Sequence, residues 1–177
     1  MTVEIFELGP GRLDETEPLW RALYDSQTDV AGQLKDRLRP FELAWADRRE
    51  LEREWLHADG RSFVLAAFDD ARIVGYAFVQ VVEGTYAVSW RISDPHADLK
   101  ALVVLPQYRG AGLGSRMMDT VEARLLDMGI EDLTIDVVNG NDDALWFYAE
   151  RGAVPFTTTL VQRIRPLPPR PQPDRTG

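Results

Sequence analysis

The chain has 177 residues, of which 45% are hydrophobic, and it carries a formal net charge of −9 at pH 7. This length suits one domain with a sizeable hydrophobic core. The absence of cysteine excludes a disulfide framework, a thiolate nucleophile and a zinc–thiolate site. No apolar run approaches the roughly 18 residues of a membrane span, and the first residues lack a signal-peptide pattern, so we expect a cytoplasmic protein with no membrane partner.

The first half of the chain predicts strands and helices in alternation. Apolar residues alternate with polar ones in the expected strands and recur at helical spacing in the expected helices. The predicted elements are a strand over residues 3–8, helices over residues 13–26 and 41–57, and strands over residues 62–68 and 73–82.

The second half continues this order and predicts an α/β fold. A helix over residues 115–128 has Met117, Val121, Leu125 and Met128 on its inner face, and Asn141 is suited to cap a helix that runs through residue 151. The other predicted elements are strands over residues 86–92, 99–105, 133–138 and 156–163, and an extended, disordered, proline-rich tail over residues 165–177.

The negative charge is concentrated upstream of residue 99. Residues 1–60 hold 8 Lys/Arg and 14 Asp/Glu, whereas residues 99–177 hold 9 and 10. Nucleic-acid binding requires clustered positive charge, so this distribution argues against nucleic acid as a partner. The acidic N-terminal part fits either a cationic partner molecule or a merely solvated surface.

A glycine-rich turn lies between the predicted central strand and the helix that follows it. It has the sequence Arg109-Gly110-Ala111-Gly112-Leu113-Gly114-Ser115. Glycine lets an anion approach the backbone amides closely, and a helix N-terminus adds positive charge. No lysine precedes Ser115, which excludes a Walker A loop, and the G-x-G-x-G spacing differs from a dinucleotide fingerprint. The turn therefore predicts a site for another phosphate; the alternative is a connector with no ligand.

Two motifs resemble those of the GNAT family of N-acetyltransferases. The pattern Arg109-x-x-Gly112-x-Gly114 is similar to the family's acetyl-CoA motif, and the stretch from Asn141 to Gly152 is similar to its second signature. Together they cover residues 98–156 in the family's order. The chain departs from the family where Ala153, rather than an aromatic residue, follows the terminal glycine. The resemblance implies a single GNAT-like domain over residues 1–164, with a mixed, mostly antiparallel, twisted sheet flanked by helices.

The resemblance also implies that acetyl-CoA is the co-substrate. The strand before the glycine turn would pair through its backbone with the pantetheine arm, and the amides of the turn would hold the pyrophosphate. The residues expected at acetyl-CoA are Leu102, Val103, Val104, Arg109, Gly110, Ala111, Gly112, Leu113, Gly114, Ser115 and Asn141.

Tyr148 occupies the position at which the family carries a tyrosine near the cofactor sulfur. The resemblance implies that it protonates the leaving thiolate; the alternative is a buried aromatic residue beside Trp146 and Phe147. Moving a proton from a phenol of pKa about 10 to a thiolate of pKa about 8.5 is uphill by roughly 2 kcal/mol. A hydrogen bond in the transition state would then suffice.

The acceptor amine must lose a proton before it attacks. For a lysine-type amine this costs roughly 4.6 kcal/mol at pH 7, which makes a general base valuable. Asp136 is our first candidate for this base, and Asp98, Glu83 or a water molecule are the alternatives. His57 and His96 fit no metal-binding pattern, so we expect no metal and interpret both as surface or loop residues.

The predicted function is acetyl-CoA-dependent N-acetyl transfer to an amine, and we favour a cationic amine as the acceptor. Without cysteine there is no acyl-thiol enzyme intermediate, which favours direct transfer in a ternary complex. The alternative is a non-catalytic acyl-CoA-binding regulatory module. The acceptor, a small molecule or a protein amine, and the oligomeric state, including a homodimer, stay open.

Overall fold

A computed structural model describes residues 3–163 except 59 and 87. The proline-rich tail predicted over residues 165–177 lies outside the described residues. The elements, in chain order, are β1 (Glu4–Glu7), η1 (Pro10–Thr16), α1 (Glu17–Val30), η2 (Gly32–Arg37), α2 (Phe41–Ala58), β2 (Phe63–Asp69), β3 (Arg72–Val82), β4 (His96–Val104), η3 (Pro106–Tyr108), α3 (Leu113–Asp127), β5 (Leu133–Ile135) and α4 (Asp142–Glu150), where η denotes a 3₁₀ helix.

The strands form one sheet in the order β1-β2-β3-β4-β5. Neighbouring strands are antiparallel except β4 and β5, which are parallel. The predicted fold class, with a mixed and mostly antiparallel sheet between helices, is therefore confirmed.

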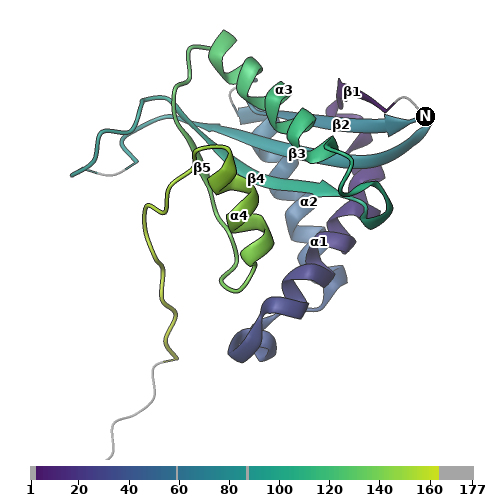
Figure 1. Ribbon diagram of the computed structural model, residues 1–177, viewed down its shortest axis with the longest axis horizontal. Helices are drawn as coiled ribbons and strands as arrows, with labels where there is room; N and C mark the ends of the chain where they lie inside the picture. The colour runs from purple at the N-terminus through teal and green to yellow at the C-terminus, as the bar shows by residue number, and fades with distance from the viewer. Residues whose placement is uncertain (1–2, 59, 87, 164–177) are drawn as a thin grey trace, which may run out of the picture.

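The helices cover both faces of the sheet, with α3 and α4 on one face and α1 and α2 on the other (Figure 1). Successive residues of a strand point to opposite faces. On β3, a Cβ atom at Gly75 would lie 2.9 Å from the sulfur of Met117 on α3, so a glycine is needed where this helix crosses. Phe78 points to the other face and meets the ring of Trp55 on α2 at 5.6 Å. The core therefore has two layers, one on each side of β3.

The register between β3 and β4 slips once. Phe78 pairs with Ala101, but Val79 pairs with Leu99, which leaves Lys100 as an extra residue with no partner on β3. Such a bulge bends its strand and interrupts the ladder of backbone hydrogen bonds. The bulge lies where β4 also parts from β5, because the last pair between those two strands is Leu99 with Ile135.

Two predicted strands are absent. Residues 86 and 88–90 form turns and bends, and residues 91 and 92 are irregular, because the strands that flank this loop, β3 and β4, already pair with neighbours on both sides. Residues 156–163 have strand-like composition but no strand partner in the described chain. Only Phe156 of this segment is partly buried, against the rings of Tyr86 and Trp90. Strand propensity needs a packed neighbour to take effect.

Other predicted boundaries shift. The first helix is preceded by η1 and starts at Glu17, and the strand predicted over residues 133–138 ends at Ile135. The interpretation of His96 as a surface or loop residue is wrong: it lies in β4, is 1% exposed and packs edge-on against the ring of Tyr86. Among the described residues, no helix is both long and apolar enough to cross a membrane.

Candidate active site

A cleft opens where β4 and β5 separate. The two strands share three residue pairs, after which β4 continues to Val104 while the chain after Ile135 turns toward α4. The cleft holds about 90 Å³. Its lining comes from α1, β4, the segment after β5 and α4: Leu23, Gln27, Leu99, Lys100, Ala101, Leu102, Ile135, Asp136, Val137, Val138, Asn141, Ala144 and Tyr148.

The C-terminal half of β4 presents backbone groups to this cleft. The N–H of Leu105 donates to the carbonyl oxygen of Val74 on β3, whereas the carbonyl oxygen of Val104 accepts from Nε of Arg109 on the other side. Alternate residues of a strand direct their backbone groups to the same edge. The backbone of Leu102 therefore faces the edge that has no strand partner, where an extended molecule can pair with it.

The side chains of the predicted strand segment differ in their surroundings. Leu102 lines the cleft, but Val103 is 4% exposed and belongs to the core. Val104 lies next to the glycine turn, since a Cβ atom at Gly114 would be 4.0 Å from its side chain. Of these three residues, only Leu102 lines the cleft.

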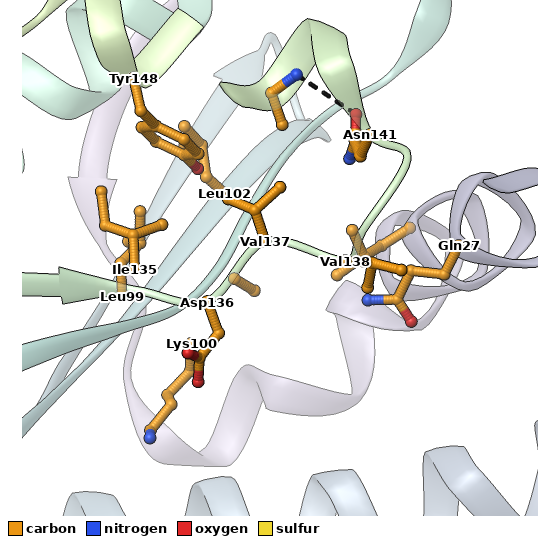
Figure 2. A pocket seen from close by; sticks show the side chains of 13 residues that line it. Gln27, Leu99, Lys100, Leu102, Ile135, Asp136, Val137, Val138, Asn141 and Tyr148 are labelled. Carbon is orange, nitrogen blue, oxygen red and sulfur yellow. Dashed lines mark hydrogen bonds between the residues drawn. The ribbon is translucent and has the colours of Figure 1, made fainter. Parts of the chain in front are cut away.

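Tyr148 and Asp136 enter the cleft from different sides. Figure 2 shows Tyr148 reaching from α4 toward the strands, whereas the side chains of Asp136 and Lys100 extend from the strands away from Tyr148. Burial raises the pKa of Tyr148 to about 12, so its phenol stays a neutral hydrogen-bond donor at physiological pH. Asp136 is exposed. One end of the cleft therefore offers a proton donor, and the other offers a carboxylate that solvent can reach.

The glycine turn leaves open space in front of the N-terminus of α3. Gly110 and Gly112 have φ of 76° and 78°, and a Cβ atom at either would meet nothing within 4 Å. Gly112 is the N-cap of α3, and the first turn of this helix has neither a side-chain cap nor an acidic residue. The first amides of a helix have no partner inside it. This end of α3 can therefore accept an anion at the amides of Leu113, Gly114 and Ser115.

Arg109 turns back toward the sheet. Its Nε lies 2.9 Å from the carbonyl oxygen of Val104, which holds the guanidinium beside the end of β4. A Cβ atom at Gly114 would lie 3.7 Å from the ring of Phe147 on α4. The glycine turn and the wall of the cleft that carries Tyr148 are thus packed together.

Asn141 caps α4, as predicted. Its side-chain oxygen accepts from the backbone N–H of Ala144 at 3.2 Å, and its side chain also lines the cleft. At the other end of α4, the guanidinium of Arg151 bonds Asp119 at 2.7 Å and Glu122 at 2.9 Å on α3. These contacts fix the helix that carries Tyr148.

The two other carboxylates proposed as bases lie in different surroundings. Asp98 accepts from Nζ of Lys100 at 2.7 Å and from the hydroxyl of Thr134. Glu83 follows the end of β3, is largely exposed and lies 3.5 Å from Arg61. Of the three candidates, only Asp136 lines the cleft.

Residues 20–153 match the model of the acetyltransferase (GNAT) family. The chain belongs to this family. It is 34% identical over 94 residues to uncharacterized N-acetyltransferases of Mycobacterium bovis and Mycobacterium tuberculosis, which covers 53% of this chain and 54% of theirs. The chain thus spans about half the length of the curated relatives it matches.

Several solved structures share the fold at low sequence identity. A protein of Bacillus halodurans superposes with a TM-score of 0.75 at 18% identity, covering 91% of this chain and 99% of that one. The aminoglycoside N-acetyltransferase AAC(6')-Iy, in complex with CoA, superposes with a TM-score of 0.67 at 20% identity, covering 93% and 95%.

Sequence reasoning missed the contribution of α1 and of the bulge to the GNAT cleft. Leu23 and Gln27 line the cleft from α1, and Lys100 lines it from the middle of an apolar strand. No local motif marks these residues. Their place depends on which helix packs against the splayed strands and on where β4 slips its register.

Proposed function

We propose that this protein is an N-acetyltransferase that passes acetyl directly from acetyl-CoA to an amine in a ternary complex. The observation that carries the proposal is the cleft between β4 and β5, whose lining includes Leu102 on the free edge of β4, Tyr148 and Asp136. Membership of the GNAT family and the likeness to a CoA-binding aminoglycoside N-acetyltransferase support it.

The donor side of the cleft fits two parts of coenzyme A, the pyrophosphate and the pantetheine arm. The open space at Gly110 and Gly112, together with the free amides at the start of α3, suits a pyrophosphate. The free edge at Leu102 suits an extended pantetheine arm, which carries amide groups that can pair with a strand. Val104 would contribute through its backbone N–H, whereas the backbone of Val103, two residues before Leu105, faces β3 and is not part of the proposed contact. Asn141 would contribute from its capping position at the cleft wall.

Tyr148 acts on the leaving sulfur as a hydrogen-bond donor. Since burial raises its pKa to about 12, full proton transfer to a thiolate of pKa about 8.5 would cost roughly 5 kcal/mol. A neutral phenol can still stabilise the negative charge that grows on sulfur as the C–S bond breaks. The thiolate then takes up a proton released from the amine, directly or through water.

Asp136 acts at the opposite end as the base for the acceptor. A protonated amine first loses one proton, which the carboxylate accepts directly or through a water molecule, and the neutral nitrogen then attacks the thioester. The second proton leaves the nitrogen as the N–C bond forms and the C–S bond breaks, and it goes to the thiolate. Asp98 is held by Lys100 and Thr134, so its oxygens are less available for this role.

We infer that the acceptor is a cationic amine. The cleft wall formed by α1 belongs to a part of the chain with 14 acidic and 8 basic residues in its first 60 positions. A negative surface around the entrance raises the local concentration of cations. Aminoglycosides, which the structural neighbour acetylates according to its name, are of this chemical class.

A thiol-release assay tests the proposal. The full chain is mixed with acetyl-CoA and, separately, with a polyamine, an aminoglycoside, a peptide with a free N-terminus, and neutral and anionic amines. We expect thiol release with at least one cationic acceptor. Preference for neutral or anionic acceptors would overturn the acceptor class, and binding of acetyl-CoA without thiol release from any amine would instead support the non-catalytic acyl-CoA-binding module.

A further inference from the structure

An arginine on α2 bonds the backbone of β4 where the cleft begins. Nη2 of Arg48 lies 3.2 Å from the carbonyl oxygen of Lys100, and Nε of the same guanidinium lies 2.6 Å from a carboxylate oxygen of Glu52 one helical turn away. Glu52 is completely buried, and the side chain of Arg48 is 16% exposed. The pair is therefore part of the interior beneath the cleft rather than a surface ion pair.

The backbone of Lys100 needs such a partner. The bulge leaves Lys100 without a partner on β3, and the pairing of β4 with β5 ends one residue earlier, at Leu99. A partly buried carbonyl group that lacks a hydrogen bond destabilises the fold. The guanidinium of Arg48 supplies the bond that neither neighbouring strand provides.

The surroundings of Arg48 restrict its movement. The carbon of its guanidinium lies 5.4 Å from the ring of Trp55 and 5.8 Å from that of Phe78. The buried carboxylate of Glu52 holds the edge of the guanidinium, and burial raises the pKa of this carboxyl group while Arg48 opposes the rise. An arginine packed between rings and bonded in this way keeps one orientation.

We propose that Arg48, held by Glu52, is a positioning residue that keeps the cleft open by occupying the carbonyl oxygen of Lys100. Residues 136–138 line the opposite wall of the same cleft, directly after the last β4–β5 pair. If the carbonyl of Lys100 loses Arg48, the nearest continuation of the parallel ladder is with the amides of these residues. That pairing would draw the walls together at the place where the donor arm has to lie, so the proposal rests on the function proposed above.

Hydrogen–deuterium exchange separates this role from simple destabilisation. In Arg48→Met, we expect slower exchange at the amides of residues 136–138, even though exchange in the core becomes faster as stability falls. General loosening of the fold would make all these amides exchange faster. Unchanged or faster exchange at 136–138 in Arg48→Met would overturn the proposal.

The matched control is Arg53→Met on the same helix. Its guanidinium bonds the exposed carboxylate of Asp14 at 2.9 Å and, among the described residues, forms no hydrogen bond or ion pair with β4. We expect normal exchange at 136–138 in this variant. In Arg48→Lys, whose ammonium can still donate to the carbonyl, we expect exchange at 136–138 between those of the wild type and Arg48→Met.

Calorimetric titration with acetyl-CoA gives the functional readout. In Arg48→Met we expect the Kd for acetyl-CoA to rise about tenfold, which corresponds to the loss of about one hydrogen bond between the protein and acetyl-CoA. In Arg53→Met we expect the Kd to stay unchanged. If Arg48→Met does not fold, Glu52→Gln is the alternative variant, because it weakens the hold on the Arg48 guanidinium while keeping the shape of the side chain at position 52. Slower exchange at residues 136–138 is expected in Glu52→Gln too. Unchanged exchange there would overturn the proposal. A wild-type protein that does not bind acetyl-CoA would refute the proposed function and leave the exchange result standing.

Discussion

The proposed donor wall of the cleft runs from the end of β4 through the glycine turn to α4, and the proposed acceptor wall is formed by α1 with α2 packed behind it. The two walls differ in what fixes their shape. Backbone conformation fixes the shape of the donor wall: Gly110 and Gly112 adopt positive φ, and Asn141 caps α4. Packing between side chains that are far apart in the sequence fixes the shape of the acceptor wall. The ring of Trp20 on α1 lies 5.3 Å from Phe41 and 5.7 Å from Trp45, both on α2.

This difference separates two tasks. A wall built from backbone amides and a free strand edge can hold a phosphate and an amide-bearing arm with few special side chains. A wall built from side-chain packing can change its shape and charge by substitution without disturbing the first. We therefore expect changes on the donor wall to act on acetyl-CoA, and changes on the acceptor wall to act on the amine.

Tyr148→Phe should give the largest effect. We expect kcat to fall by about 100-fold, with KM for acetyl-CoA nearly unchanged, because the hydroxyl stabilises charge that exists on sulfur only in the transition state. Since burial raises the pKa of Tyr148 to about 12, the ratio of wild-type to variant rates should be constant across neutral and mildly alkaline pH. Steady-state kinetics at several pH values measure both.

Tyr24→Phe is the control for this prediction. It removes a hydroxyl that donates to the carbonyl oxygen of Arg39 at 2.5 Å, outside the cleft, and it should leave kcat unchanged. An equal loss of kcat in the two variants, or no loss in Tyr148→Phe, would remove Tyr148 from the mechanism.

Gly112→Ala tests whether backbone approach defines the donor wall. A Cβ atom at this N-cap stands where the pyrophosphate is expected, and losing one charge-assisted hydrogen bond of about 2 kcal/mol would raise KM for acetyl-CoA by about 30-fold. Gly129→Ala is the matched control, because Gly129 has φ of 71°, has open space around its Cβ position, and follows the other end of α3. Both variants should lose similar stability, and equal KM values would contradict the proposed site.

Asp136→Asn tests the acceptor end of the cleft. We expect kcat/KM for the amine to fall by about tenfold at neutral pH. This loss is smaller than the loss expected on removing a base that contacts the amine directly, because a water molecule can relay the proton. The loss should shrink as pH rises and the amine deprotonates by itself. The charged control is Glu83→Gln, outside the cleft; a larger loss there would assign the base elsewhere.

The sequence could predict the local structure of the proposed donor wall because its signals are local. The cap at Asn141 and the glycine turn before α3 each depend on residues within a few positions, and the structure bears out both elements. Lys100 on β4 and Leu23 on α1 have no such signal. Lys100 reaches the cleft because β4 slips against β3, and Leu23 reaches it because α1 packs beside the splayed strands.

The two strands that were predicted wrongly have the same explanation, because their formation also depends on long-range arrangement. Residues 86–92 and 156–163 have suitable composition, but whether a strand forms depends on a free sheet edge at the right place. The burial of His96 likewise follows from the position of β4 in the sheet and from contact with Tyr86. Long-range arrangement, rather than local propensity, decided each of these cases.

Asn141→Ala should give the smallest effect and distinguishes two uses of one residue. Loss of the bond to the N–H of Ala144 should lower the free energy of unfolding by about 1 kcal/mol, measured by urea denaturation. Asn141→Asp keeps a capping oxygen and should keep the stability. If Asn141→Asp also keeps the KM for acetyl-CoA, the residue acts on the donor wall only as a cap; if KM rises while stability is retained, its amide contacts acetyl-CoA. A donor wall defined by backbone geometry alone requires the first result.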